Sequence, residues 1–198
     1  MSARIVVLAS GHGTNLQAII DACASGEIDG SVAAVVADRS EAHALARAAA
    51  AGITGIALTR LPAEERADYD ARLATVVAGH APDWVVLAGW MRILTTTFLG
   101  RFPDRVVNLH PALPGAFPGT KAIERAFAAH EQDGLDTTGV MVHLVPDEGV
   151  DNGPVLATAV VPIEPNDTID SLTARVHLIE HRLLVETLAR LCAQEVSA

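Results

Sequence analysis

The sequence predicts an α/β fold with a Rossmann-like, mostly parallel sheet, helices on both faces and an antiparallel C-terminal extension. Short runs rich in Val and Ile alternate with stretches that have a helical pattern, which is typical of a parallel sheet covered by helices. The last two of these runs are joined by the short connection 147–153 and are expected to pair antiparallel. At 198 residues, half of them hydrophobic, the chain fits one large domain better than two.

The first strand and the first helix flank a turn that contains glycine. RIVVLA at 4–9 is the predicted strand. Thr14 and Gln17 have the T-x-x-Q spacing of a capping box at the start of the helix, which extends to about residue 25. SVAAVVAD at 31–38 is the second strand, and an alanine-rich helix over 40–51 follows it. A glycine directly after each helix marks its C-terminal end.

The middle of the chain contains one weak and two strong strand signals. ITGIAL at 53–58 predicts the weak strand. Pro62 suits the first position of the next helix, which is expected to end near residue 79. WVVLAG at 84–89 and RVVNLH at 105–110 are most typical of buried strands, and a short helix near 95–101 joins them.

The C-terminal part begins with a rigid, irregular loop over 111–119 that contains several prolines and glycines. A helix is expected at about 120–132, followed by strands at 139–146 and 154–162. A long amphipathic helix over 168–194 closes the predicted fold. The sequence shows no internal repeat and no low-complexity segment.

Charge and composition argue against several classes of function. The chain has 14 Lys and Arg against 24 Asp and Glu, a formal net charge of −10, which argues against nucleic-acid or anionic-membrane partners. The apolar run at 5–9 is too short for a signal peptide or a membrane span. Cys23 and Cys192 lack metal-ligand spacing and suit a reducing compartment. We therefore expect a soluble, cytoplasmic protein without a bound metal.

GHGTNL at 11–16 lies between the first strand and the first helix, where doubly wound folds present backbone N–H groups to an anion. Its glycines permit close approach of a ligand, and Thr14 and Asn15 add side-chain donors. Leu16 stands where a dinucleotide fingerprint has its third glycine, so we favour a cradle for a single phosphate. An ordinary tight turn is the alternative. Asp38 is better explained as a loop acid than as a ribose-binding group.

Asn108 and His110 carry the strongest chemical signal. Side chains alternate along a strand, so both lie on one face, at the carboxyl end of an apolar strand where open α/β sheets bind ligands. An Asn amide can donate to a developing oxyanion, and a His titrates near neutrality. A carboxylate of Asp147, Glu148 or Asp151 could pair with the histidine and raise its pKa. The spacing does not choose among these acids, and a non-catalytic polar pair beside a solvated turn is the alternative.

Two other histidine patterns carry less weight. HLIEH at 177–181 matches the H-x-x-E-H pattern of metalloproteases. The carboxylates after it, Glu186 and Glu195, lie on or at the end of the same helix, so a polar helix stripe is favoured over a metal site. The remaining histidines have no ligand spacing and are interpreted as mostly loop or helix-surface residues: His12, His43, His80, His130 and His143.

Four motifs together resemble one enzyme family. They are GHGTNLQAI at 11–19, LAGWMRIL at 87–94, NLHPALPGAFPG at 108–119 and VDNGPVL at 150–156. In this order and spacing the chain is similar to the phosphoribosylglycinamide formyltransferases, the folate-dependent glycinamide ribonucleotide transformylases of purine biosynthesis. The resemblance implies the formyltransferase fold as a single domain over 1–198. It further implies a phosphate-binding half over about 1–100 and a folate-binding and catalytic half over about 101–198.

The resemblance also implies a set of site residues. The substrate phosphate would bind at Gly13, Thr14 and Asn15. The folate site would consist of Arg66, Met91, Arg92, Ile93, Leu94 and Asn108. The catalytic residues would be Asn108, His110 and Asp151. Glu180, in the last helix, would lie near the substrate.

The reaction that the resemblance implies is transfer of a formyl group from 10-formyltetrahydrofolate, as co-substrate, to the amine of glycinamide ribonucleotide. The amine would attack the formyl carbon directly, with Asn108 and protonated His110 stabilising the oxyanion. Asp151 would raise the pKa of His110 and assist proton movement. A monomer or homodimer is expected, with small-molecule substrates, no metal, and no nucleic-acid or membrane partner.

Three alternatives stay open: a methionyl-tRNA formyltransferase-like enzyme, a formyltetrahydrofolate hydrolase-like enzyme, and a non-catalytic nucleotide-binding protein. The first would need an RNA-binding domain and a basic surface, and the second usually carries an N-terminal regulatory domain, neither of which is expected here. The chain also departs from the family pattern. The loop at 112–119 reads ALPGAFPG where Leu-Leu-Pro is common, Met141 replaces a small hydroxyl residue, and the acidic loop is one residue longer before Asp151.

Overall fold

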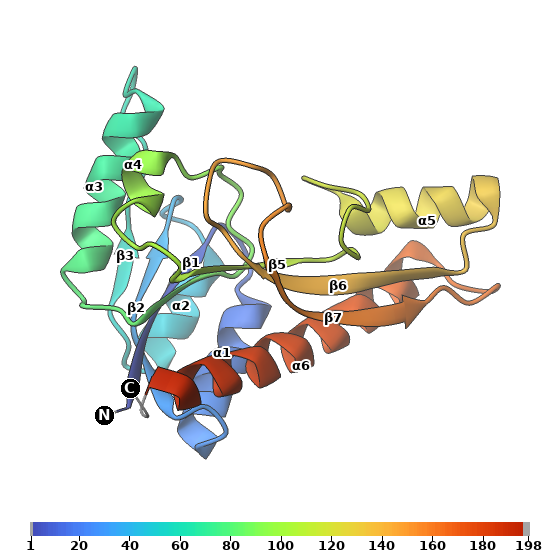
Figure 1. Cartoon of the computed structure of the whole chain (residues 1–198), viewed down its shortest axis with the longest axis horizontal. Helices are drawn as coiled ribbons and strands as arrows, with labels where there is room; N and C mark the ends of the chain where they lie inside the picture. Colours follow the sequence, from blue (N-terminus) through green and yellow to red (C-terminus); the bar gives the residue numbers. More distant parts are fainter. Residues whose placement is uncertain (1, 196–198) are drawn as a thin grey trace.

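The computed structural model describes residues 2–195 and has a seven-stranded sheet at its centre (Figure 1). The strand order is β3-β2-β1-β4-β5-β6-β7. The strands are β1 (Ala3–Ala9), β2 (Gly30–Ala37), β3 (Gly55–Ala57), β4 (Trp84–Leu87), β5 (Val106–His110), β6 (Thr137–Leu144) and β7 (Val155–Pro162).

The pairing confirms the predicted mostly parallel sheet with an antiparallel extension. Strands β1 to β5 pair parallel with their neighbours, whereas β6 runs antiparallel to both β5 and β7. The carboxyl ends of β1, β4 and β5, which are adjacent in the sheet, therefore meet at one edge. In open α/β sheets this edge is where ligands bind.

Helices cover both faces of the sheet, as predicted. They are α1 (Thr14–Ser25), α2 (His43–Ala50), α3 (Arg66–Ala78), α4 (Thr96–Leu99), α5 (Ala122–Asp133) and α6 (Ile169–Glu195). Side chains of α1, α2, α5 and α6 join one hydrophobic core, and those of α3 and α4 join the core on the opposite face. Within residues 2–195 no helix has the length and apolar character needed to cross a membrane.

The packing of α6 yields a stability prediction. Leu184 is fully buried in the core, whereas Leu178 on the same helix is 69% exposed. Leu184→Ala should lower the free energy of unfolding by about 2–5 kcal/mol, because it removes buried apolar surface and leaves a cavity. Leu178→Ala, as the matched control, should change it by less than about 0.5 kcal/mol. Urea unfolding of both variants measures the difference, and equal losses would contradict the packing of α6.

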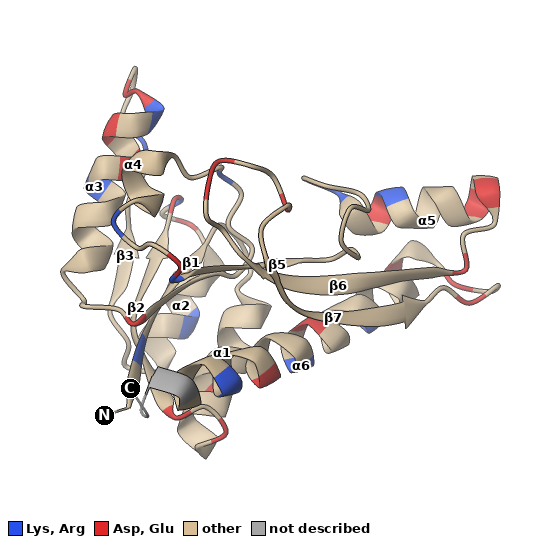
Figure 2. Ribbon diagram, viewed as in Figure 1, with Lys and Arg blue, Asp and Glu red and all other residues tan. Residues whose placement is uncertain are grey.

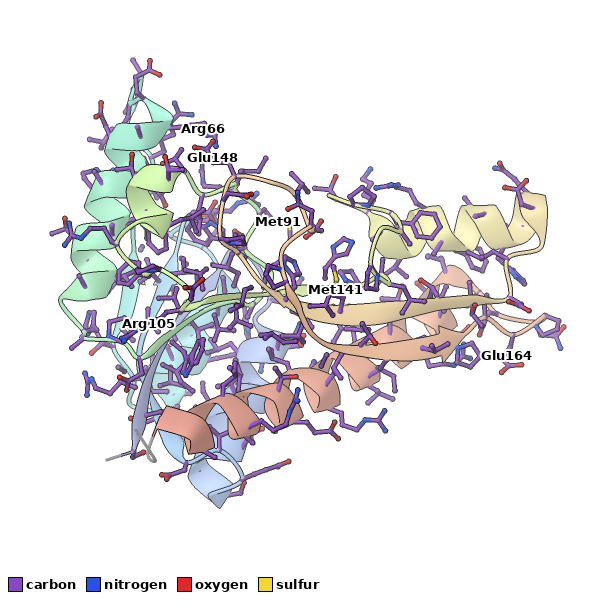
Figure 3. The ribbon with its side chains drawn as sticks, in the orientation of Figure 1. Arg66, Met91, Arg105, Met141, Glu148 and Glu164 are labelled. Carbon is purple, nitrogen blue, oxygen red and sulfur yellow. The ribbon has the colours of Figure 1, made fainter. Side chains whose placement is uncertain are left out.

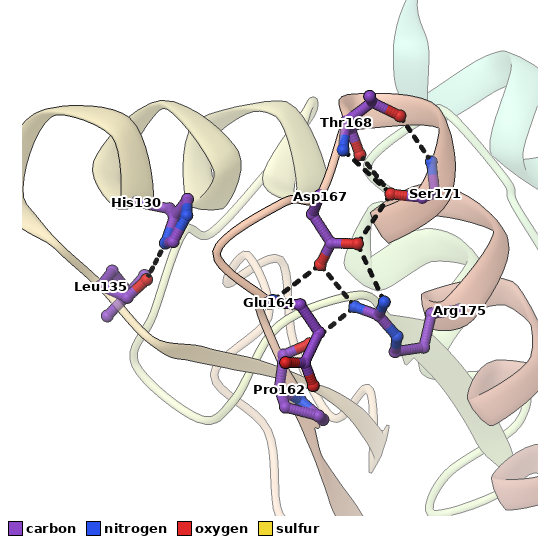
Figure 4. A network of polar contacts seen from close by, with 8 residues as sticks. All are labelled: His130, Leu135, Pro162, Glu164, Asp167, Thr168, Ser171 and Arg175. Carbon is purple, nitrogen blue, oxygen red and sulfur yellow. Dashed lines mark hydrogen bonds and ion pairs between the residues drawn. The ribbon is translucent and has the colours of Figure 1, made fainter.

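A polar network precedes α6 and ties it to the end of β7 (Figure 4). The Asp167 carboxylate accepts two hydrogen bonds from the Arg175 guanidinium, at 2.6 and 2.9 Å, and one from the Ser171 hydroxyl at 2.7 Å. Arg175 also donates to the Pro162 carbonyl at 2.9 Å. The hydrogen bonds from Arg175 and Ser171 hold the pKa of Asp167 well below its usual value. The network fixes the direction in which α6 leaves the sheet.

The predicted capping box at the start of α1 is wrong. The N-cap is Gly13, with a left-handed φ of 71°, and no side chain caps the helix. Gln17 instead donates to Asp21 at 2.9 Å and accepts from Arg47 at 3.1 Å. The left-handed turn makes Thr14 the first helical residue, so its side chain is not placed as a cap.

The predicted start of α3 at Pro62 is also wrong, because the helix begins at Arg66. Ala63 has a left-handed φ of 58°, which a right-handed helix does not accommodate. The Glu64 carboxylate, in the turn before α3, accepts a hydrogen bond from Arg72 of the helix at 2.6 Å. The remaining predicted elements are all present, with ends that differ by a few residues.

Candidate active site

A cavity of about 230 Å³ lies at the carboxyl ends of β4 and β5. Its walls come from five segments: 87–94 after β4, 108–111 at the end of β5, 119–122 before α5, His143 and Val145 at the end of β6, and the acidic loop 147–151 between β6 and β7. The adjacent strands β4, β5 and β6 bring these distant segments together. The cavity therefore occupies the edge of the sheet at which the fold is expected to bind ligands.

The structure brings Asn108, His110 and Asp151 into mutual contact. Asn108 Nδ2 donates to Asp151 Oδ1 at 3.0 Å. His110 Nδ1 lies 3.3 Å from Asp151 Oδ2. Asp151 has a left-handed φ of 51°, and its Oδ2 also accepts the Gly119 N–H at 2.8 Å. Asp151 is thus the acid of the 147–151 loop that faces the two strand-end residues.

The other two acids of this loop point elsewhere. Asp147 accepts the N–H of Gly149 within its own turn at 2.8 Å. Glu148 accepts the N–H of Thr96 at the start of α4 at 3.2 Å, and it lies 3.5 Å from an Arg66 nitrogen. The sequence pattern does not show which of the three acids pairs with His110. The conformation of the loop places Asp151 in that position.

His110 is buried, and both of its ring nitrogens face acceptors. Nδ1 faces Asp151, and Nε2 is 3.2 Å from the Phe117 carbonyl oxygen. Burial lowers the pKa of His110 below its ordinary value, although Asp151 and the Phe117 carbonyl partly raise it. Asp151 therefore raises this pKa, as expected, but the loss of solvation has the larger effect. Negative charge that develops in the cavity would favour the imidazolium.

Asp151 is held in its ionised form. Burial by itself would raise the pKa of Asp151, but the nearby His143, the hydrogen bond from the Gly119 N–H and the nearby His110 bring it below the ordinary value. The cluster therefore contains an ionised carboxylate beside a buried histidine.

His143 belongs to the same cluster, so the interpretation of the remaining histidines as mostly loop or helix-surface residues is wrong for this one. It is buried on β6, directly opposite Asn108 in the β5–β6 register. Its Nδ1 donates to the Leu144 carbonyl at 2.8 Å, so Nε2 accepts from Asn108 Nδ2 at 3.1 Å. Both amide hydrogens of Asn108 thus point at protein acceptors, Asp151 and His143. One must turn away before Asn108 can donate to an oxyanion.

The glycine loop is held tightly at the start of α1. A Cβ on Gly13 would lie 2.9 Å from Ala44, so glycine is required there by space as well as by its positive φ. Arg47 donates to the His12 carbonyl at 2.8 Å and fixes the loop from α2. The N–H groups in the first turn of a helix lack intrahelical acceptors and carry partial positive charge. The N–H groups of this turn therefore present partial positive charge at the start of α1.

The glycine loop and the cavity are neighbours. Ser10, which precedes the loop, donates its N–H to the Gly89 carbonyl at 3.1 Å and accepts the Met91 N–H on its hydroxyl at 3.0 Å. Both partners belong to the cavity wall after β4. The glycine loop therefore adjoins the cavity wall after β4.

Glu180 lies under the glycine loop. It is on α6, only 6% exposed, and it accepts a hydrogen bond from the Asn15 side chain. Burial raises the pKa of Glu180 to about 7, despite the opposing effect of Asn15. A predicted phosphate-site residue and the predicted substrate-binding acid therefore touch, although they lie near opposite ends of the chain.

The raised pKa of Glu180 predicts that the folded protein loses stability as the pH rises. Glu180→Gln should abolish this loss. The carboxyl ionises near 4.5 in the unfolded chain and near 7 in the folded one. Between these values only the folded state keeps the proton. The unfolding free energy of the wild type relative to Glu180→Gln should therefore fall by about 1.4 kcal/mol per pH unit and level off above pH 7.

Urea unfolding between about pH 5 and 8 checks this prediction. Glu186→Gln, at an exposed position of the same helix, is the matched control and should track the wild type. A difference between wild type and Glu180→Gln that stays constant with pH would contradict the burial of an ionisable group at this position.

The predicted folate residues surround the cavity and a second hollow beside it. Met91, Arg92, Ile93 and Leu94 line the cavity, and Arg66 lines the neighbouring hollow together with the first three of them. Met91 is 60% and Ile93 49% exposed, whereas Leu94 is buried. Arg66 donates to the Ile93 carbonyl at 3.3 Å and faces Glu148 (Figure 3). It therefore contacts two walls of the cavity.

Asp38 has a structural partner. It is buried at the end of β2 and accepts a 2.7 Å hydrogen bond from Arg92 Nε. The Arg92 guanidinium also lies over the Tyr69 ring, 5.3 Å from its centroid. Asp38 thus positions Arg92.

The H-x-x-E-H segment forms no metal site in the structure. His177 Nε2 is 3.9 Å from Glu180 Oε2 on the same helix. Among residues 2–195, no group of three or more His, Cys, Asp or Glu side chains is arranged to hold a metal ion.

Comparison with known proteins identifies related sequences over almost the full length. The family model described as "Formyl transferase" matches residues 3–188. Phosphoribosylglycinamide formyltransferase of Dictyostelium discoideum is 41% identical over 201 residues, covering 95% of this chain and 97% of the relative. The enzyme of the same name from Schizosaccharomyces pombe is 44% identical over 200 residues, covering 95% and 96%.

Solved structures agree with this result. Glycinamide ribonucleotide transformylase 1 from Symbiobacterium toebii has a TM-score of 0.91 at 40% identity, covering 97% of this chain and 88% of that one. Phosphoribosylglycinamide formyltransferase from Bacillus halodurans has a TM-score of 0.91 at 38% identity, covering 97% and 96%.

Proposed function

Because the chain belongs to the formyl transferase family, we propose that it transfers the formyl group of 10-formyltetrahydrofolate to the amine of 5′-phosphoribosylglycinamide in purine biosynthesis. The names of the relatives and the extent of the match support this acceptor over the tRNA or water that the two rival enzymes use. The observation that carries the proposal is the contact of Asn108, His110 and Asp151 in one cavity.

The two substrates are assigned to the two adjoining parts of the site. The ribonucleotide phosphate binds the N–H groups and side chains of Gly13, Thr14 and Asn15. Glu180, which touches Asn15, faces the sugar of the same substrate. The folate binds in the cavity, along the walls formed by Met91, Arg92, Ile93, Leu94, Arg66 and Asn108.

The reaction proceeds by direct attack of the substrate amine on the formyl carbon. A carbon–nitrogen bond forms and the formyl oxygen becomes an oxyanion, whose negative charge favours the imidazolium of His110. His110 Nε2 exchanges the Phe117 carbonyl for the oxyanion, to which Asn108 also donates. One such donor is typically worth about 2.7–4 kcal/mol. The bond to the folate nitrogen breaks as that nitrogen takes up the proton that the amine releases, and Asp151 assists this movement.

Substrate binding has to act against the charge of the chain. The net charge is −10, and acidic residues lie on the loop after β6, directly at the cavity (Figure 2). Both proposed substrates are anions, so local attraction is required. The first turn of α1 supplies it for the phosphate, and the guanidinium groups of Arg66 and Arg92 supply it at the cavity.

The wider setting of the enzyme is also a proposal. We propose cytoplasmic action as a monomer or homodimer. The division into a phosphate-binding half over about 1–100 and a folate-binding and catalytic half over about 101–198 stays a prediction. Residues 87–94, in the first of these ranges, contribute a wall of the folate cavity.

A transfer assay tests the proposed function. The purified chain is mixed with 10-formyltetrahydrofolate alone, with phosphoribosylglycinamide, or with methionyl-tRNA, and release of tetrahydrofolate is followed. We expect release only with phosphoribosylglycinamide. Release with the donor alone would indicate a hydrolase, release with methionyl-tRNA would indicate the tRNA enzyme, and phosphate-ligand binding without any transfer would indicate a binding protein.

A further inference from the structure

The chain contains a single lysine, and that lysine lies at the active site. Thirteen of the 14 basic residues are arginines, and Lys121 is the exception. It lines the cavity together with Asn108, His110 and Asp151. Two permanent cations line this cavity, Arg92 and Lys121.

These two cations differ in their partners. Arg92 is committed to Asp38 through a 2.7 Å ion pair. Within the described residues Lys121 has no ion pair, and its side chain is exposed at the rim of the cavity. An unpaired cation beside a cavity is available to a ligand. Because the net charge of the chain is −10, an anionic ligand needs such a local positive charge to bind.

The backbone holds Lys121 in an unusual conformation to place it there. Its φ of 57° is left-handed, a region that residues other than glycine, asparagine and aspartate rarely adopt. Arg125 clamps the preceding turn by donating to the Pro118 and Thr120 carbonyls at 2.7 and 3.3 Å, and its N–H bonds the Lys121 carbonyl. Gly119, in the same turn, donates to the catalytic-site acid Asp151.

We propose that Lys121 binds an anionic group of a substrate at the rim of the cavity. This inference rests on the proposed function, whose two substrates offer that chemistry from two sources, the carboxylates of the folate and the phosphate of the ribonucleotide. Lys121 lies at the rim of the cavity, two residues beyond Gly119, and there its charge strengthens binding and contributes no proton to the chemistry.

Steady-state kinetics of three variants tests the proposal. Lys121→Gln and Lys121→Asn remove the charge, and asparagine tolerates the left-handed backbone. Lys121→Arg keeps the charge. Both neutral variants should raise the KM of one substrate about tenfold, the lower end expected for a charged hydrogen bond, with kcat within about twofold and Lys121→Arg close to wild type. The substrate whose KM changes identifies the source of the anion.

Chemical modification gives an independent readout. An amine-reactive succinimidyl ester labels Lys121 as the only side-chain amine, and peptide mapping separates it from the N-terminal amine. The substrate that Lys121 binds should slow its labelling, whereas the other should not. The KM of that substrate should also rise less steeply with salt in Lys121→Gln than in the wild type.

Two results would overturn the proposal while leaving the proposed function intact. One is wild-type turnover with both KM values unchanged in Lys121→Gln. The other is impairment of Lys121→Gln together with normal kinetics of Lys121→Asn, which would assign the effect to the backbone. A wild-type chain that turns over neither substrate would instead remove the proposed function, and the role of Lys121 with it.

Discussion

Asp151→Asn is expected to lower the turnover of formyl transfer by about 10²–10⁴-fold. The carboxylate faces His110 at 3.3 Å, accepts from Asn108 at 3.0 Å and accepts the Gly119 N–H at 2.8 Å. An amide of the same shape keeps the packing but loses the charge that supports the imidazolium and the acceptor that assists proton transfer. The loss should therefore appear in kcat, with melting temperature close to that of the wild type.

The pH dependence of Asp151→Asn provides a second readout. Asp151 raises the pKa of His110 and so partly offsets the effect of burial. Removing its charge lowers this pKa further. If protonated His110 is required, the activity that remains in the variant should decline with rising pH earlier than in the wild type.

Asp104→Asn is a matched control for this variant. Asp104 also has a left-handed φ, 57°, but it is exposed on the turn before β5, outside the cavity wall. The control should keep full activity and the wild-type pH profile. Near-normal turnover of Asp151→Asn would contradict the assignment of this carboxylate.

His110→Ala is expected to lower kcat by a similar factor of about 10²–10⁴, because it removes the donor to the oxyanion. Since Asp151 acts largely through His110, the double variant His110→Ala/Asp151→Asn should be little worse than the more damaged single variant. Steady-state kinetics of the four proteins gives this coupling directly.

His130→Ala is the control for loss of an imidazole. His130 is a half-buried histidine on α5 that bonds the Leu135 carbonyl at 2.6 Å, and it does not line the cavity. It should keep wild-type turnover. Fully additive losses in the double variant would show that His110 and Asp151 act separately, against the mechanism proposed above.

Local sequence patterns were enough to predict the sheet and its helices. Runs such as WVVLAG and RVVNLH combine β-branched residues with flanking turns, and in the fold they become the buried strands β4 and β5. Alternation along β5 also predicts that Asn108 and His110 share a face. Both properties depend on residues close together in the chain, which is why a single sequence reveals them.

Features set by tertiary geometry were harder to predict. His143 joins the cluster because β6 pairs with β5 in a register that places it opposite Asn108. The alternation of side chains along β6 could have indicated which face His143 lies on. Its partner on β5 depends on the register of the whole hairpin. The contact of Asn15 with Glu180 joins α1 to α6, and no spacing within either helix indicates it.

Backbone conformation and burial account for the remaining errors. The left-handed φ of Ala63 delays the start of α3 past Pro62, and that of Gly13 removes the predicted cap. Alanine gives no signal for the first conformation, and glycine permits the second without dictating it. The net effect on the pKa of His110 depends on how completely the fold removes water from the ring, which the pattern around an Asn-x-His motif does not determine.

The central claim is direct transfer of the formyl group from folate to amine at one site, and a single-turnover experiment with isotopically labelled formyl group tests it most directly. Enzyme in excess over 10-formyltetrahydrofolate is mixed with phosphoribosylglycinamide and quenched over time. We predict that label leaves the folate and enters the ribonucleotide amine in equal amounts at equal rates, with none on the protein. Label on the protein before it reaches the ribonucleotide, or its release as formate, would contradict the account.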